Sequence, residues 1–391
     1  MPGRVPLVIV VTSLVAACGS TGAHSATTSP SPAPSVVASA TPGPTPTPAP
    51  SPSPTLDVTP LIPDLTADGT LHLVREDGLT TASFPPSTSL ELFSPLGSDF
   101  LGGARINQQI SSLVSIQADG SLDTLQAITD PGTFSGAIGA PDGHAWAWLQ
   151  GPIYSSLCNR GLSSGTLEFG SPGSPAHAVA QLPNAGASAG WALGGWIGDN
   201  IWLVRTSGCP STSTVTTAAY TINENGGSLT SVQSALGSGC ALTAMSLDGS
   251  MLCATQPAKT ADMTWRFVGA GGMVRNFSAA SLPGVCAGHG TLKDFEGLTL
   301  SLDGTYISID AGCAGTVRFD QLFLIATATG AATLVNTQTY LAASSWLPDG
   351  TLICTDLSDP MAAHSYLVTP AGVVTPFVSG DSVWTVTDVI W

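Results

Sequence analysis

The stretch Leu242-Thr-Ala-Met-Ser-Leu-Asp-Gly-Ser-Met-Leu-Cys253 contains two short apolar runs separated by an Asp-Gly pair. Such runs are typical of β-strands, and Asp-Gly supplies the positive φ that a tight hairpin turn requires. A degenerate copy, Ser94–Gly97, precedes Phe100. The full pattern returns at Gly136–Trp148, Leu193–Val204, Leu298–Ile309 and Ala343–Cys354. The sequence therefore predicts a hairpin that is repeated along the chain.

A second kind of hairpin alternates with the first. Its turns centre near seven glycines that lie 42 to 59 residues apart: Gly78, Gly120, Gly173, Gly226, Gly271, Gly330 and Gly372. Two hairpins in ~48 residues have the size of a four-stranded propeller blade. The pattern predicts an all-β fold for residues 57–391, a seven-bladed β-propeller, with six or eight blades as alternatives. A stack of β-sandwich domains is another alternative, but the unbroken repeat spacing favours the propeller.

The chain ends in a strand that has no hairpin partner, Val383–Trp391. The first blade is one strand short, because seven outer hairpins are accompanied by only six complete inner ones. We expect the C-terminal strand to lie beside residues 57–65, complete the first blade and close the ring. Closure removes the open sheet edges that would otherwise promote aggregation.

Composition limits the function classes. The 391 residues include 10 Lys and Arg against 26 Asp and Glu, which gives a net charge of −16. So acidic a chain lacks the basic surface that binds a phosphate backbone, and we predict no nucleic-acid partner. A hydrophobic content of 43% argues against a wholly disordered chain, and only 9% charged residues argue against a mostly helical one.

The repeats resemble the WD-like repeats of TolB-type bacterial propellers. The resemblance is carried by the pattern Ser/Leu-Pro/Leu-Asp-Gly-x-x-Leu/Ile-Cys/Ser and covers most of residues 57–391. The Asp-Gly pair is kept well in four copies, at Asp142, Asp248, Asp303 and Asp349. The resemblance implies a fold more than a chemistry, and TolB itself is periplasmic rather than lipidated.

The N-terminus is typical of an exported protein. Arg4 precedes an uncharged apolar stretch of 13 residues, Val5–Ala17, which is too short to span a membrane but suits a signal peptide. The stretch ends in Val15-Ala-Ala-Cys18, which resembles the bacterial lipobox. That resemblance implies cleavage after residues 1–17 and acylation of Cys18, so that the protein is held on the extracytoplasmic face of the cell membrane. The alternative is an ordinary signal peptide followed by a chance cysteine.

Residues 18–56 predict a disordered linker. From 19 to 55 they contain 10 Pro and 15 Ser or Thr and no charged residue, so nothing here can build a core. Such a segment suits a spacer between a lipid anchor and the propeller domain at 57–391.

The remaining cysteines are divided by position. Five are expected in loops at one face of the ring, where export makes disulfides plausible. We favour Cys158–Cys209 and Cys286–Cys313, which leaves Cys240 over, with Cys209–Cys240 as the competing pair. Cys253 and Cys354 occupy the same place in their repeats, and we expect both to be small buried core residues.

No motif identifies a reaction. Gly186-Ala-Ser188-Ala-Gly190 matches the Gly-x-Ser-x-Gly pattern of hydrolases, but no helix follows it. Cys286-Ala-Gly-His289 has the spacing of a metal-ligand pair, but no second pair accompanies it. Trp196 and Trp346 could contact a sugar, although packing between blades is the simpler interpretation. We therefore assign no catalytic, cofactor-binding or metal-binding residue.

The sequence favours a binding protein. We expect a monomeric, membrane-anchored scaffold that binds a protein, a peptide or a glycan, presented by the loops between blades. The alternative is a polysaccharide- or peptide-processing enzyme whose residues are scattered over several blades. One observation separates them: His, Arg and carboxylates converging on a mouth of the central channel favour the enzyme. A mouth lined by Ser, Thr, Gly and isolated aromatic residues favours binding.

Overall fold

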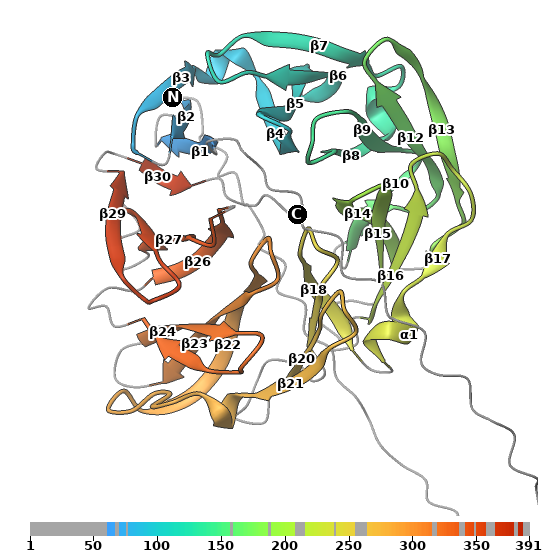
Figure 1. Cartoon of the computed structure of the whole chain (residues 1–391). Helices are drawn as coiled ribbons and strands as arrows, with labels where there is room; N and C mark the ends of the chain where they lie inside the picture. Colours follow the sequence, from blue (N-terminus) through green and yellow to red (C-terminus); the bar gives the residue numbers. More distant parts are fainter. Residues whose placement is uncertain are drawn as a thin grey trace, which may run out of the picture.

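The computed structural model describes residues 61–66, 70–75, 77–156, 159–186, 189–207, 216–237, 240–254, 264–314, 319–335, 341–347, 349–356, 364–378 and 382–385. The predicted signal peptide, Cys18 and the linker lie outside these residues. Within them the strands form seven sheets arranged in a ring around a common axis (Figure 1). The only α-helix of the described residues is the single turn α1 (Gln233–Leu236). The predicted seven-bladed β-propeller is confirmed.

Each blade contains four antiparallel strands. From the axis outward, blades 1 to 3 consist of β30 (Ser382–Thr385), β1 (Leu61–Thr66), β2 (Leu71–Arg75) and β3 (Thr80–Phe84); β4 (Leu90–Leu96), β5 (Asp99–Ile106), β6 (Gln109–Ile116) and β7 (Leu122–Ala127); and β8 (Phe134–Gly139), β9 (Trp146–Gln150), β12 (Gly165–Ser171) and β13 (Ser174–Leu182).

Blades 4 to 7 follow in chain order. They consist of β14 (Ala189–Ile197), β15 (Asn200–Ser207), β16 (Thr216–Asn223) and β17 (Thr230–Ser231); β18 (Ala241–Met245), β19 (Met251–Ala254), β20 (Thr264–Val268) and β21 (Val274–Ser278); β22 (Thr291–Leu300), β23 (Tyr306–Ala314), β24 (Phe319–Ala326) and β25 (Ala332–Leu334); and β26 (Leu341–Trp346), β27 (Leu352–Asp356), β28 (Ser365–Val368) and β29 (Val374–Val378).

The first and last described strands meet in blade 1, while residues 386–391 of the predicted C-terminal strand lie outside the described residues. Strand β30 pairs antiparallel with β1, with Asp64 opposite Thr385 and Leu65 opposite Trp384. The last described strand is therefore the innermost strand of the first blade, as the unpaired C-terminal strand predicts. Backbone hydrogen bonds rather than chain continuity close the ring.

Both predicted kinds of hairpin are present. The inner turns lie between the first and second strands of blades 2 to 7, and the outer turns lie between the third and fourth strands of all seven blades. The outer turns each contain a glycine with φ between 75° and 95°, in the region that side chains with a Cβ rarely adopt. In blade 5 this residue is Gly272, next to the predicted Gly271.

One hairpin departs from the regular plan. Strands β10 (Ile153–Ser156) and β11 (Asn159–Leu162) are inserted between the second and third strands of blade 3. Leu162 pairs with Trp191 at the start of β14, so the hairpin joins the sheet of blade 4. The insertion connects these two blades through backbone pairing as well as side-chain packing.

The hydrophobic core is divided among the seven seams between neighbouring blades. Because strand side chains alternate between the two faces of a sheet, each blade presents one apolar face to each neighbour. The seam between blades 3 and 4 is built around Trp191 and Trp196, and the seam between blades 5 and 6 around Trp265. Trp346 lies in the seam between blades 6 and 7. These buried indoles pack between blades rather than facing outward to a sugar.

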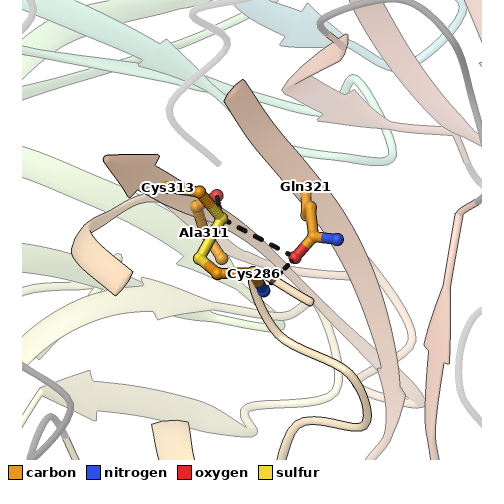
Figure 2. Close-up of a disulfide and its surroundings, with 4 residues drawn as sticks. All are labelled: Cys286, Ala311, Cys313 and Gln321. Atoms are coloured by element: carbon orange, nitrogen blue, oxygen red, sulfur yellow. Dashed lines mark hydrogen bonds between the residues drawn. A yellow bond between two sulfur atoms is a disulfide. The ribbon is translucent and has the colours of Figure 1, made fainter. Parts of the chain in front are cut away.

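The cysteines behave partly as expected. Cys286 and Cys313 form a disulfide, the pairing that the sequence favours (Figure 2). The buried Gln321 side chain lies beside it, and its Oε1 accepts a hydrogen bond of 2.6 Å from the Cys286 backbone N. Cys354 is a free, buried cysteine, and burial, with a further contribution from Asp310, raises the pKa of its thiol well above the ordinary value.

The interpretation of Cys240 and Cys253 was wrong in part. Cys253 is a buried core residue, as expected, but it forms a disulfide with Cys240, which is therefore not left over. Their Cα atoms are 5.5 Å apart. Leu242 lies opposite Cys253 in the pairing of β18 with β19. Cys240 lies two residues before Leu242, so it is the diagonal neighbour of Cys253 in the same hairpin. The alternative Cys209–Cys240 is thereby contradicted, while Cys158 and Cys209 lie outside the described residues.

Within the part of the chain that the structure describes, no helix has the length and apolar character that a membrane crossing requires.

Candidate functional site

A pocket lies where the innermost strands of blades 2 to 5 end at their inner turns. It is small: the space between its atoms is about 370 Å³ when the part open to solvent is counted, but only about 20 Å³ of it is a cavity in the usual sense. Its walls come from four consecutive blades, through Ser94, Ile138, Gly139, Trp196, Ile197 and Met245. Because each inner strand ends at the same level of the ring, residues from distant parts of the sequence meet at one mouth of the channel.

The polar groups in the pocket wall are already satisfied. Ser94 Oγ donates to the carbonyl of Pro95 at 3.1 Å and accepts a hydrogen bond of 2.7 Å from Gly139 N, in the next blade. Ser246 Oγ hydrogen-bonds to the Asp248 carboxylate in its own turn. With these hydroxyls occupied, the surface offered to a ligand is mainly that of apolar side chains.

Trp196 connects the pocket to a charged cluster. The residue is only 2% exposed, and its indole Nε1 donates to the carbonyl of Gly198 at 3.0 Å. The His144 ring packs edge-on against the indole, with ring centroids 5.8 Å apart, and Phe169 lies on it at 6.0 Å. The indole is therefore held rigidly between blades 3 and 4.

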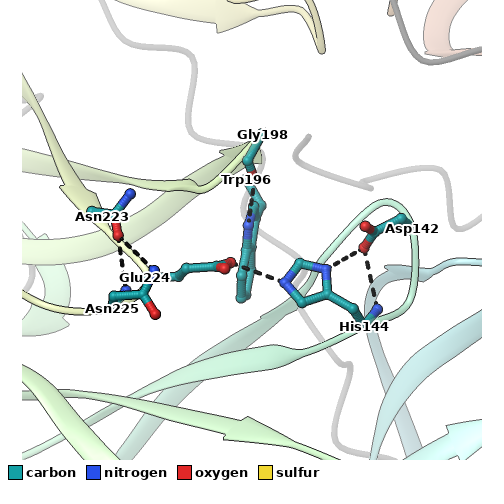
Figure 3. Close-up of polar contacts among 7 residues, drawn as sticks. All are labelled: Asp142, His144, Trp196, Gly198, Asn223, Glu224 and Asn225. Carbon is teal, nitrogen blue, oxygen red and sulfur yellow. Dashed lines mark hydrogen bonds and ion pairs between the residues drawn. The ribbon is translucent and has the colours of Figure 1, made fainter.

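The charged cluster consists of Asp142, His144 and Glu224 (Figure 3). His144 Nδ1 contacts Asp142 Oδ1 in the same inner turn, and Nε2 lies 2.9 Å from Oε2 of Glu224, in the outer turn of blade 4. Burial alone would lower the pKa of His144. The hydrogen bonds that the ring makes to Asp142 and Glu224, together with the charges of these carboxylates, outweigh burial and raise the pKa above the ordinary value.

This geometry favours a structural ion pair over a catalytic base. Ionised carboxylates only accept hydrogen bonds, so an imidazole between two of them must donate from both nitrogens and is therefore protonated. A general base needs one unprotonated nitrogen facing the reacting group. His144 thus links the turns of blades 3 and 4 across 80 residues of sequence.

The structure separates the residues that the motifs suggested. Ser188 lies outside the described residues. Cys286 is bonded to Cys313, so it is not a ligand in a Cys-x-x-His metal pair. In the described ranges, no group of three or more His, Cys, Asp and Glu side chains is placed to hold a metal ion.

Sequence reasoning missed both the pocket and the cluster. The histidines are scattered along the chain, and nothing local associates His144 with Glu224. One sequence signal could have identified His144. It directly follows the Asp142-Gly143 turn, and a residue at that position lies at the inner-turn end of its blade. The loops between blades, which the sequence favours as the binding surface, lie partly outside the described residues, and the pocket is instead at the inner turns.

Comparison with known proteins gives a likeness at the level of fold. No family model matches the sequence, and no curated protein matches it either. An acylaminoacyl peptidase from Pyrococcus horikoshii matches over 79% of this chain and 48% of its own, with 12% identity and a TM-score of 0.51. A prolyl endopeptidase matches over 77% and 43%, with 14% identity and a TM-score of 0.44.

TolB from Acinetobacter baumannii is also among the similar structures. It matches over 80% of this chain and 78% of its own, with 11% identity and a TM-score of 0.36. The chain spans less than half the length of the two peptidases. At 12% identity and a TM-score of 0.51, the match to the acylaminoacyl peptidase supports a shared fold and assigns no activity.

Proposed function

We propose that this protein is a lipid-anchored, extracytoplasmic binding scaffold whose channel mouth holds part of a protein, peptide or glycan partner. One observation carries the proposal: the pocket at the inner turns of blades 2 to 5 is apolar, preformed and free of unsatisfied hydroxyls in its wall. Mostly apolar pockets with a few fixed polar groups are the usual form of ligand sites. Ser94, Gly139, Ser246 and the single aromatic residue Trp196 agree with the lining expected for binding, whereas the neighbouring cluster of His144 and two carboxylates is the feature expected for an enzyme.

The pocket proposal is tested by capture of a partner from intact cells. Ile197 lines the pocket and is half-buried, so Ile197→Arg places a charge in the site without removing a large core side chain. Val373→Arg is the matched control, because Val373 is an apolar residue, 57% exposed, on the outer turn of blade 7. We expect Ile197→Arg to lose a crosslinked partner that Val373→Arg retains. Equal capture by both variants would contradict the proposal.

Membrane anchoring is a separate part of the proposal. It is supported by the sequence Val15-Ala-Ala-Cys18 at the end of an apolar stretch. Two or three acyl chains give stable anchoring where a single chain binds membranes only marginally. Cys18→Ala should therefore move the protein from the detergent phase to the aqueous phase in a phase-partitioning experiment. A Cys18→Ala protein that stays in the detergent phase would rule the anchor out.

A peptide-processing enzyme is the second candidate function, and one observation favours it. His144 with Asp142 reproduces the base and its orienting carboxylate as they occur in hydrolases. The second carboxylate, Glu224, occupies the nitrogen that would receive a proton. A fluorophosphonate probe separates the two functions: we expect no labelling, whereas labelling that His144→Gln abolishes would establish the enzyme.

A further inference from the structure

The inner turns next to the pocket carry carboxylates. Each of the six inner turns carries one aspartate: Asp99, Asp142, Asp199, Asp248, Asp303 and Asp349, in blades 2 to 7 respectively. The first four belong to the blades that line the pocket, and the side chain of Asp142 is 71% exposed. None of the ten Lys and Arg residues lies in an inner turn.

Contacts between neighbouring turns fix the positions of several of these carboxylates. Leu247 N in the turn of blade 5 donates to Leu302 O in the turn of blade 6 at 2.8 Å. In blades 2 and 3, the Gly97 and Gly143 backbones are so close that a Cβ on Gly97 would lie 3.1 Å from the Gly143 Cα. The six inner-turn aspartates together are called the rim.

The rim is only partly neutralised. In the described part of the chain, the one cation paired with an inner-turn aspartate is His144, which contacts Asp142. Other rim carboxylates accept hydrogen bonds from uncharged donors within their own turns. Asp248 Oδ1 accepts from Ser250 N at 2.9 Å, and Asp303 Oδ1 accepts from Thr305 N at 3.0 Å. Such bonds leave the negative charge in place, and like charges around a low-dielectric cavity focus the field at its mouth.

An apolar pocket with a negative rim fits a ligand of complementary form. We propose that the mouth binds a segment of a protein partner in which one aliphatic side chain is flanked by Lys or Arg. The aliphatic side chain lies against the pocket wall formed by Ile197 and Met245, while the flanking cations lie over the aspartates of the rim. The proposal rests on the proposed function and specifies its partner. The acidic rim disfavours anionic lipid and nucleic acid at the same place.

The test uses peptides that differ in one feature at a time. The probe is the amidated peptide Lys-Lys-Leu-Lys-Lys, with one analogue in which Glu replaces each Lys and another in which Ser replaces Leu. Binding to the full chain in non-ionic detergent is measured by calorimetry at low and high salt. We expect the Lys/Leu peptide to bind best and to weaken with salt, because the Debye length falls from about 30 Å at 0.01 M to about 3 Å at 1 M.

The rim itself is tested by removing charge without changing the turns. In Asp199→Asn/Asp248→Asn, the amide oxygen at position 248 can still accept the turn hydrogen bond from Ser250 N. The matched control is Asp77→Asn/Asp119→Asn, since Asp77 and Asp119 accept from Leu79 N and Ser121 N in the same way but lie in outer turns. We expect the first pair of substitutions to lower the affinity for the peptide about fivefold at low salt, because each removes one exposed ion pair. The control pair should leave the affinity unchanged.

The outcomes separate this inference from the function on which it rests. Equal binding of the Glu-containing peptide, or equal effects of the two Asn pairs, would overturn the inference. If capture of a cellular partner depends on Ile197 but peptide binding depends neither on salt nor on the rim aspartates, the binding function stands and a cationic partner is excluded. Loss of all Ile197 dependence would instead reject the function.

Discussion

Neighbouring blades are held together differently at two seams of the ring, the one between blades 3 and 4 and the one between blades 7 and 1. Of the residues whose side chains the structure describes, sixteen form the buried cluster at the first seam, including Trp191 and Trp196, and five form that at the second, where the side chains of β30 are outside those described. The first seam is also crossed by the hairpin β10–β11 and by the His144–Glu224 contact. At the second, the first and last described strands meet through the pairing of β1 with β30.

The difference indicates how the ring divides stability and function. The pocket is built on blades 2 to 5 and is centred on the heavily packed seam, away from the closing one. A binding site benefits from walls that do not move. The closing seam, by contrast, depends on the pairing of two strands that are not consecutive in the chain. We therefore expect the closing seam to limit stability and the seam between blades 3 and 4 to hold the site.

The largest effect is expected from deleting residues 382–391. The deletion removes β30, leaves the inner edge of β1 unpaired and opens the cluster that contains Ile62, Val74 and Ile353. Each buried side chain of this size contributes roughly 1.5–3 kcal/mol, so several together approach a total stability of about 5–15 kcal/mol. Thermal melting and size-exclusion chromatography should report aggregation or a much lower Tm.

The control for that deletion is removal of residues 19–55, which contain no charged residue and no apolar pattern that could build a core. Its Tm should equal that of the full chain. A protein without its C-terminal strand that stays monomeric and melts normally would disprove closure by β30.

The next effect in size concerns the heavily packed seam. Trp191 is almost fully buried there and donates from Nε1 to Pro183 O at 2.9 Å. Trp191→Ala should cost about 3–5 kcal/mol in the free energy of unfolding, because it leaves a large cavity and an unpaired carbonyl. Denaturant unfolding measures this cost, with Trp191→Phe as the milder companion. A cost below that of Leu79→Ala, on an exposed turn, would contradict the assigned packing.

A smaller effect of opposite sign is expected in the closing blade. Asp64 on β1 is 4% exposed, its Oδ1 has no hydrogen-bond partner, and burial raises the pKa of its carboxyl, with His72 opposing. An acid with a raised pKa destabilises the fold above that pKa, and the penalty disappears as the pH falls to the ordinary value. Asp64→Asn should therefore stabilise the protein at pH 7 by about 1 kcal/mol.

The pH dependence provides the check on Asp64. The gain from Asp64→Asn, measured by chemical denaturation, should shrink between pH 7 and pH 4. A gain that is the same at both pH values would mean that the carboxyl is not strained by burial.

The smallest effect concerns the link between the turns of blades 3 and 4. The pKa of His144 is raised, so its contribution to stability is complete below the pKa of free imidazole and is lost as the pH rises through the raised value. The side chain is 41% exposed, so solvent screening limits the contribution to a few tenths of a kcal/mol. His144→Gln should lower Tm slightly at pH 5.5 and not at pH 9. The same decrease at both would exclude an ionic link.

The sequence predicts the blades well because their signals are local. A tight turn needs a residue that tolerates positive φ, so Gly78, Gly120 and their counterparts mark the outer hairpins directly. The C-terminal strand is identified by the same logic, since a repeat that lacks a strand requires one from elsewhere. The inserted hairpin β10–β11 has no counterpart among the described residues of the other blades, and the repeat pattern does not reveal it.

The site is less predictable because it depends on how blades are placed against one another. Cys240 and Cys253 pair through a diagonal in one hairpin, which requires the strand register to be known. His144 and Glu224 meet only because the inner turn of one blade lies beside the outer turn of the next. The pocket likewise exists only when four inner strands end at one level of the ring.

The most direct test of the binding site compares the two regions in one experiment. A photoreactive amino acid is placed either at Ile197, in the pocket beside the heavily packed seam, or at Leu79, an exposed residue of the outer turn in the closing blade. Irradiation of intact cells followed by purification and mass spectrometry identifies what each position touches. We expect a specific partner at Ile197 and none at Leu79. The same partner at both positions, or a partner at Leu79 alone, would contradict a binding site at the channel mouth.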